Sequence, residues 1–188
     1  MGMRAPKVEY TVDDLARMPD DGSRYEIIDG ELLVTPAPRL GHQSAVVELV
    51  KILGPYADSL GLRLFVAPTD VRASRKSQVE PDLFVVPRSS APDHRALFVM
   101  MRGVLLAIEI LSPSTAKIDR GAKRVLYQAQ GVAEYWIVDV EKCIVDVWTP
   151  EAVEARTEAP SLRWQPVAGR EPLEIDLVAM FASVRDAG

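Results

Sequence analysis

The sequence is poor in the residues that build disulfide bonds and zinc sites. Its 188 residues include one cysteine, Cys143, and two histidines, His42 and His94. One cysteine excludes an internal disulfide, so a reducing, cytoplasmic location is the expectation. The same scarcity disfavours a zinc site with the usual nitrogen and sulfur ligands.

Long apolar runs and nucleotide-binding motifs are missing as well. No stretch approaches the roughly 20 apolar residues that cross a membrane, and the opening MGMRAPKVEYTVDD has no signal-peptide core. We therefore expect no membrane association. Neither GxGxxG nor a P-loop is present, so nucleotide binding has no support. The net charge of -5 argues against an obligate nucleic-acid binder, but it allows an enzyme whose metal-binding cleft is acidic.

The remaining pattern is that of one α/β domain over residues 1–188. Asp29-Gly30 between two β-prone runs predicts a tight hairpin. Pro55 predicts a kink or an early break in a helix over 41–60. Alternating strands and helices predict a three-layer α/β/α sandwich with a mixed central sheet. The other expected elements are a helix from Thr11, strands at 62–68, 69–74, 79–87 and 103–111, a hairpin over 132–149, an irregular segment over 151–170, a strand at 172–177 and a short terminal helix.

Residues 119–130 predict a helix with two distinct faces. Ala122, Val125, Leu126 and Ala129 are expected to pack inward, because they recur at helical spacing. Asp119, Lys123, Tyr127 and Gln130 fall on an adjacent face, where Asp119 and Lys123 form an ordinary i,i+4 ion pair. The apolar run CIVDVWT at 143–149 resembles an exposed sheet edge, which makes a homodimer possible.

Two acids interrupt apolar strands. Asp82 lies in VEPDLFVV and Glu109 in VLLAIEIL, and both strands carry apolar residues on both faces, which is typical of a covered central strand. A buried carboxylate is costly unless a cation compensates it. If the two strands pair, the carboxylates converge and suit Mg²⁺ or Mn²⁺, with the backbone carbonyl of Ile110 as a further oxygen ligand. Lys123 would then supply positive charge near a phosphate.

Each of these residues also has a plain structural explanation. One acid beside apolar residues is a weak signal, and a lysine on a helix is usually solvated. Asp70 is either a cleft residue or a turn cap, and the sequence does not decide between them. The order of the two acids and the lysine is far more specific than any single member.

That order carries a resemblance to a known family. EPDLFVV, AIEILSPST, Asp119, Lys123, Tyr127 and GVAEYWIVD, together with the upstream RYEIIDGELLVTPAP and His42, resemble the Uma-type family of endonucleases. That family belongs to the PD-(D/E)XK, or restriction-endonuclease-like, superfamily. The resemblance runs from Thr11 to about Phe181, so the nuclease-like core is expected over about 11–181.

The resemblance implies roles for individual residues. Asp82 and Glu109 become the metal ligands, and Glu26 and His42 complete the cleft. The superfamily lysine lies two residues after the second acid, where this sequence has Leu111, so Lys123 is expected to fill its role from the following helix. The plain alternatives are an ion pair of Glu26 with Arg24 and a helix-end position for His42. Tyr127 is expected to be structural, with its hydroxyl orienting Lys123 or a phosphate.

The function implied by the resemblance is that of a Mg²⁺- or Mn²⁺-dependent endonuclease acting on DNA. RNA is an alternative substrate for the same site. The competing function is a catalytically inactive nuclease fold that binds nucleic acid or has a structural role. Cleavage lost in Asp82→Ala and Glu109→Ala would favour the enzyme, whereas binding without cleavage would favour the module.

Overall fold

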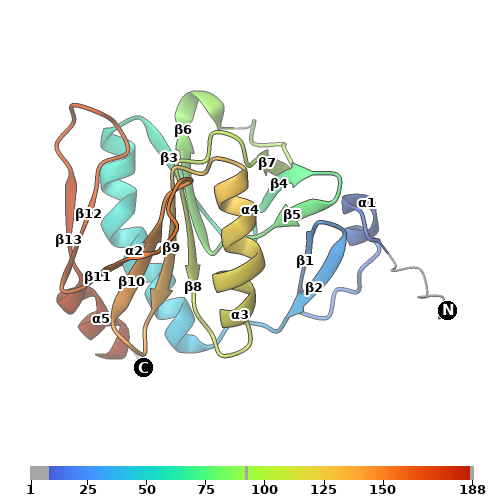
Figure 1. The fold of residues 1–188 in the computed structure, drawn as a ribbon, viewed down its shortest axis with the longest axis horizontal. Coiled ribbons are helices and arrows are strands. Elements are labelled where there is room, and N and C mark those ends of the chain that lie inside the picture. The colour runs from blue at the N-terminus through green and yellow to red at the C-terminus, as the bar shows by residue number, and fades with distance from the viewer. Residues whose placement is uncertain (1–8, 92, 187–188) are drawn as a thin grey trace.

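The computed structural model describes residues 9–91 and 93–186, arranged as Figure 1 shows. The helical segments are α1 Val12–Leu15, α2 Leu40–Ser59, η1 Arg88–Ser90, α3 Ala116–Ile118, η2 Asp119–Lys123, α4 Arg124–Ala129 and α5 Leu177–Asp186. The strands are β1 Arg24–Ile28, β2 Glu31–Thr35, β3 Leu62–Val66, β4 Asp70–Ser74, β5 Ser77–Val79, β6 Leu83–Pro87, β7 Phe98–Met100, β8 Leu106–Ile110, β9 Glu134–Asp139, β10 Ile144–Trp148, β11 Arg156–Glu158, β12 Ser161–Trp164 and β13 Leu173–Asp176.

The β1–β2 hairpin turns where its sequence predicts. Asp29 and Gly30 both have positive φ, at 49° and 78°, as a type I′ turn requires. Glycine adopts this conformation without strain and aspartate tolerates it better than most residues. The two strands then pair in register from Ile28↔Glu31 to Arg24↔Thr35. This register sets Arg24 and Glu26 on one face of β1, since they are two residues apart.

The central sheet has six strands in the order β11-β10-β9-β8-β6-β3. It is mixed, because β6 and β8 run antiparallel whereas β8 and β9 run parallel. The strand that follows Asp82 therefore lies directly beside the strand that contains Glu109, which meets the condition for the two carboxylates to converge. The remaining strands form a separate five-stranded sheet, β2-β1-β5-β4-β7, and a β12–β13 hairpin, a division that the sequence pattern did not reveal.

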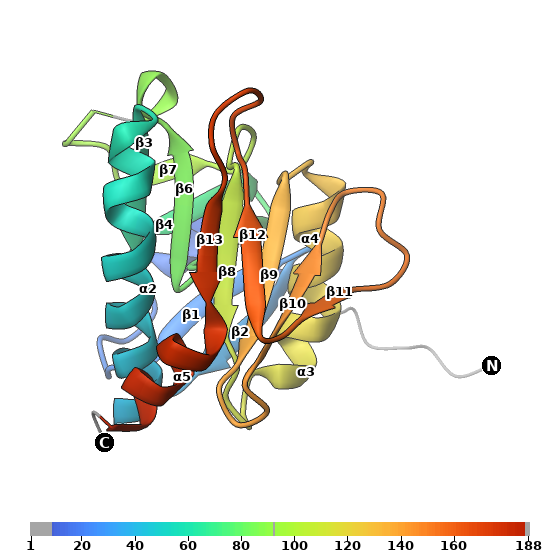
Figure 2. The ribbon, with the colours of Figure 1, turned by 90° about the vertical axis from the view of Figure 1, so that its left-hand side faces the viewer.

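Helices cover both faces of the central sheet, which agrees with the predicted fold class (Figures 1 and 2). On one face α2 buries Leu49 and Leu53 in a core that α5 completes with Phe181. On the other face α4 buries Leu126 and Tyr127 against Phe84 and other residues of β6, β8 and β9, and the core continues to Val71 and Val79 of the five-stranded sheet.

Three local predictions are wrong. Of the kink or early break predicted at Pro55, the early break does not occur: the helix continues to Ser59, because Leu49, Leu53 and Ala57 bury the same face on either side of the proline. The segment over 151–170 is not irregular throughout, since it forms β11 and β12. β10 is consequently no open edge, because β11 pairs with it on the side away from β9. No helix in the described residues is long and apolar enough to span a membrane.

Candidate active site

The five residues singled out by the sequence come from five different segments and line one cavity of about 430 Å³. Glu26 lies on β1, His42 near the start of α2, Asp82 directly before β6, Glu109 on β8 and Lys123 at the end of η2. Ile110 and the 112–115 turn also line the cavity. Packing the β1–β2 hairpin, α2 and η2 around the β6–β8 pair thus brings the predicted site residues together.

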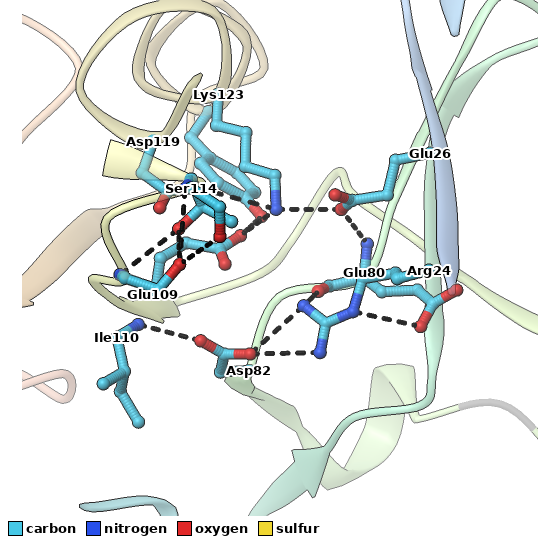
Figure 3. A network of polar contacts seen from close by, with 12 residues as sticks. Arg24, Glu26, Glu80, Asp82, Glu109, Ile110, Ser114, Asp119 and Lys123 are labelled. Atoms are coloured by element: carbon cyan, nitrogen blue, oxygen red, sulfur yellow. Dashed lines mark hydrogen bonds and ion pairs between the residues drawn. The ribbon is translucent and has the colours of Figure 1, made fainter. Parts of the chain in front are cut away.

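The site has two halves. The inner half consists of Lys123, Glu26, Glu109, Asp119 and Tyr127, with Lys123 at its centre, and Figure 3 shows this lysine between Glu109 and Glu26. Its Nζ lies 2.9 Å from Glu109 Oε1, 2.9 Å from Glu26 Oε1 and 3.9 Å from Asp119 Oδ1. The Tyr127 hydroxyl donates to the same Glu109 oxygen at 3.0 Å. All of these side chains are buried. One buried ammonium thus has three buried carboxylates around it. Glu26 is paired with this lysine and not with Arg24, which rules out the plainer explanation of that residue.

The outer half consists of Asp82, Arg24, His42 and the Ile110 main-chain N–H. The Asp82 carboxylate is at its centre and accepts hydrogen bonds from the other three. Arg24 donates from Nη1 and Nη2 to Oδ1 at 3.1 and 3.2 Å. His42 Nε2 lies 2.9 Å from Oδ2, and the Ile110 main-chain N–H donates to that oxygen at 2.8 Å. Because an ionised carboxylate can only accept hydrogen bonds, His42 donates here from Nε2. The remaining His42 nitrogen, Nδ1, is buried and has no hydrogen-bond partner among the described residues.

A π-helical turn brings Lys123 into the site. α3, η2 and α4 follow one another, and the π turn Asp119–Lys123 has both ends buried. Such turns are rare and are frequent at functional sites. The predicted inward face is wrong in this region: Leu126 is buried, but Ala122, Val125 and Ala129 are exposed. Asp119, Lys123 and Tyr127 are buried in their place, because ion pairs and hydrogen bonds compensate the cost of burying polar groups.

The two principal acids have opposite pKa shifts. Burial opposes ionisation of Asp82, but the His42 hydrogen bond, the positive charge of Arg24 and the Ile110 N–H outweigh it and lower the pKa of that carboxyl. Burial raises the pKa of Glu109 well above its ordinary value, against the attraction of Lys123. Burial likewise raises the pKa of Asp119 to about 6. Burial works against the charge of Lys123, yet Glu109, Glu26 and Asp119 raise its pKa and keep it protonated.

Sequence reasoning missed part of the polar network. Arg24 pairs with Asp82 and also donates to the main-chain carbonyl of Glu80 at 2.9 Å. Its position two residues before Glu26, hence on the same strand face, was the available signal. The Tyr127 hydroxyl contacts Glu109, whereas Lys123 or a phosphate was the expected partner. Asp70 does not line the cavity.

The donor atoms suit a hard divalent cation. Glu26, Asp82, Glu109 and Asp119 place four buried carboxylates at one cavity, and Glu26 Oε2 and Asp119 Oδ1 accept no hydrogen bond from the described residues. In the described ranges, however, no three His, Cys, Asp or Glu side chains are close enough together to hold an ion by themselves. Mg²⁺ commonly binds one or two carboxylates together with waters and substrate phosphates, so this donor set fits it.

The chain is similar to a known family in sequence and to a solved structure in fold. A family model, Uma2, described as "Putative restriction endonuclease", matches residues 12–178. A crystal structure from Anabaena variabilis, described as "a putative nuclease belonging to DUF820", has a TM-score of 0.78 and 19% sequence identity, and the match covers 93% of this chain and 98% of that one. No curated protein matches the sequence. The solved structure confirms the fold class, a restriction-endonuclease-like α/β arrangement.

Proposed function

The chain belongs to the Uma2 family, and from that premise we propose that it is a metal-dependent endonuclease that hydrolyses phosphodiester bonds in DNA. DNA is the proposed substrate because the family is described as a restriction endonuclease family. The observation that carries the proposal is the convergence of Asp82, Glu109 and Lys123 on one cavity from the residue before β6, from β8 and from η2.

The charges around the cavity support the metal dependence. Four buried carboxylates face one buried lysine and the partly exposed Arg24, so negative charge is in surplus. A divalent cation would neutralise this surplus. Asp82 and Glu109 would hold the ion, with the Ile110 carbonyl as a further oxygen ligand. A bound divalent ion supplies Lewis acidity, which lowers the pKa of water and offsets the charge that develops on a phosphodiester.

The chain's own residues have separate tasks in the proposed reaction. Lys123 is held within 2.9 Å of Glu109 and presents a fixed positive charge to the attacking water or the scissile phosphate. Glu26 and Tyr127 orient this pair through the contacts at Lys123 Nζ and Glu109 Oε1. His42 and the Ile110 N–H fix the orientation of Asp82. Because these groups are already held in position by the fold, they need not reorganise during the reaction.

Plasmid cleavage tests the proposal. We expect nicking or linearisation with Mg²⁺ or Mn²⁺, none with a chelator, and a loss of at least about a hundredfold in Asp82→Asn and in Glu109→Gln. Glu134→Gln is the matched control, because Glu134 is a partly buried acid on β9 that does not line the cavity. Its carboxylate accepts a hydrogen bond of 2.7 Å from Trp136 Nε1. The cleavage rate of this control should equal that of the wild type.

Each other outcome has a defined meaning. Cleavage that survives both Asp82→Asn and Glu109→Gln would remove these residues from the mechanism. Retarded migration of DNA without cleavage by either metal would favour the inactive binding module. Cleavage of a single-stranded or duplex RNA of the same length, with DNA intact, would move the substrate to RNA.

A further inference from the structure

Both oxygens of Asp82 are already occupied by donors of the protein. Oδ1 accepts from two Arg24 nitrogens, and Oδ2 accepts from the Ile110 N–H and contacts His42 Nε2. Among the described residues no three potential ligand side chains converge to hold an ion. A divalent ion therefore reaches Asp82 only if one of these donors gives way.

Arg24 is the donor best able to leave. The Ile110 N–H is part of the main chain of β8, in the middle of the central sheet, and cannot move independently. The side chain of His42 is 13% exposed, whereas that of Arg24 is 21% exposed at the end of a long flexible stem. Arg24 also lines a second cavity of about 380 Å³, which shares Arg24 and residues 36–38 with the first.

The second cavity gives the guanidinium a route to a new partner. Its walls include Pro36, Pro38 and Pro68, and Arg24 is the one Lys or Arg among its lining residues. A phosphate that enters along this shared wall meets the guanidinium, whose planar fork matches phosphate oxygens bidentately. Arg24 stays anchored meanwhile, since its Nη1 donates to the Glu80 carbonyl and its Nε lies 3.6 Å from the Glu80 carboxylate.

We propose that Arg24 is an exchangeable counter-ion, which releases Asp82 to a divalent metal ion when a substrate phosphate takes its guanidinium, so that metal and DNA bind cooperatively. The proposal rests on the proposed nuclease function and adds its order of assembly. Without DNA, Arg24 competes with the metal for Asp82 and weakens metal binding. With DNA, the competitor is withdrawn, and by linkage the metal strengthens DNA binding by the same factor.

Lys123 cannot take part in such an exchange. Its side chain is 3% exposed, and Glu26, Glu109 and Asp119 all surround its ammonium. Arg24 and Lys123 are thus two cations of different kinds, one at the rim and replaceable, the other enclosed and fixed.

Two binding measurements on the full chain test the coupling. The first is the Ca²⁺ affinity of the free protein by calorimetry, with Ca²⁺ as a hard, oxygen-seeking probe. The second is the factor by which Ca²⁺ tightens binding of a fluorescently labelled mixed-sequence duplex, measured by anisotropy, with a gel to verify that the duplex stays intact. We expect Arg24→Gln to bind Ca²⁺ about tenfold more tightly than the wild type and to lose most of the Ca²⁺-induced gain in DNA affinity.

Matched variants make the result specific. Arg88→Gln removes an arginine from an exposed pair with Asp58 at 2.8 Å and should behave as the wild type in both measurements. Arg24→Lys keeps the charge but loses the forked contact, and should fall between wild type and Arg24→Gln. Thermal unfolding checks that the variants fold, and added Ca²⁺ should raise the melting temperature of Arg24→Gln more than that of the wild type.

The outcomes separate this proposal from the proposed function. An Arg24→Gln protein whose Ca²⁺ affinity equals or falls below that of the wild type overturns the exchange. If Asp82→Asn abolishes Ca²⁺ binding in the same experiment, the metal site stands and the role of Arg24 alone is lost. If Ca²⁺ binding is undetectable in every variant, or unchanged in Asp82→Asn, the metal-dependent function itself falls with it.

Discussion

The outer and inner halves of the site shift the pKa of a buried carboxyl group in opposite directions. Asp82 in the outer half receives charged and main-chain donors that lower its pKa and keep it ionised. Glu109 in the inner half shares one lysine with Glu26 and Asp119, and burial raises its pKa well above the ordinary value. One acid is therefore compensated within the protein, and the other lies in a pocket with surplus negative charge. The difference teaches that two acids of one site can make unequal contributions to the stability of the fold.

Removing the lysine should break the inner half and have the largest effect. Lys123→Met leaves three buried carboxylates without their common cation, and we expect a loss of about 3–5 kcal/mol in the free energy of unfolding near neutral pH. Urea unfolding measures it. Lys142→Met is the control, because Lys142 is 69% exposed and pairs with Asp139 at 3.6 Å on the surface. A Lys123→Met protein as stable as the wild type would show that Glu26, Glu109 and Asp119 are not all ionised at the same time.

Neutralising each acid should separate the halves more sharply. Asp82→Asn takes away the carboxylate that Arg24 and His42 share and should lose about 2 kcal/mol at neutral pH. Glu109→Gln removes surplus charge, while Lys123 keeps two acids, and its stability should be unchanged or slightly higher. Both variants should nevertheless lose cleavage.

The pH dependence of the two variants should have opposite signs. The pKa of Asp82 is lowered by folding, so its ionised form stabilises the protein above the ordinary pKa of about 4, and that stability is lost as the pH falls. The pKa of Glu109 is raised by folding, so its ionisation opposes folding as the pH increases. As the pH rises to about 4, Asp82→Asn should therefore fall further behind the wild type and then stay level with respect to it, whereas above about pH 4 Glu109→Gln should gain on the wild type. Parallel urea titrations that show the same slope for both would contradict the contrast.

The sequence predicted the two principal acids of the site but not all of the groups that contact them. Asp82 and Glu109 were predictable, because an acid in a strand that is apolar on both faces needs a compensating partner. Lys123 was predicted as their cation, but Arg24 was not, because it lies 58 residues from Asp82 and no local periodicity connects them. The inward face of residues 119–130 was wrong for the same reason. Apolar spacing predicts the face that buries carbon, whereas this segment buries a lysine whose partners come from β1 and β8, and an aspartate that pairs with that lysine.

Removing one hydroxyl should give the smallest effect and distinguish a role in the site from a role in packing. Tyr127 and Tyr135 are both buried, their rings lie 4.6 Å apart, and each donates one hydrogen bond, Tyr127 to Glu109 Oε1 and Tyr135 to the main-chain carbonyl of Asp119. Tyr127→Phe and Tyr135→Phe should each lose about 1 kcal/mol of stability, because each leaves one buried acceptor with one donor fewer. Only Tyr127→Phe should also reduce the cleavage rate, by a few-fold, because Glu109 then loses a donor that orients it. Equal cleavage by the two variants would assign Tyr127 to packing alone and leave Lys123 and Glu26 as the groups that orient the inner half.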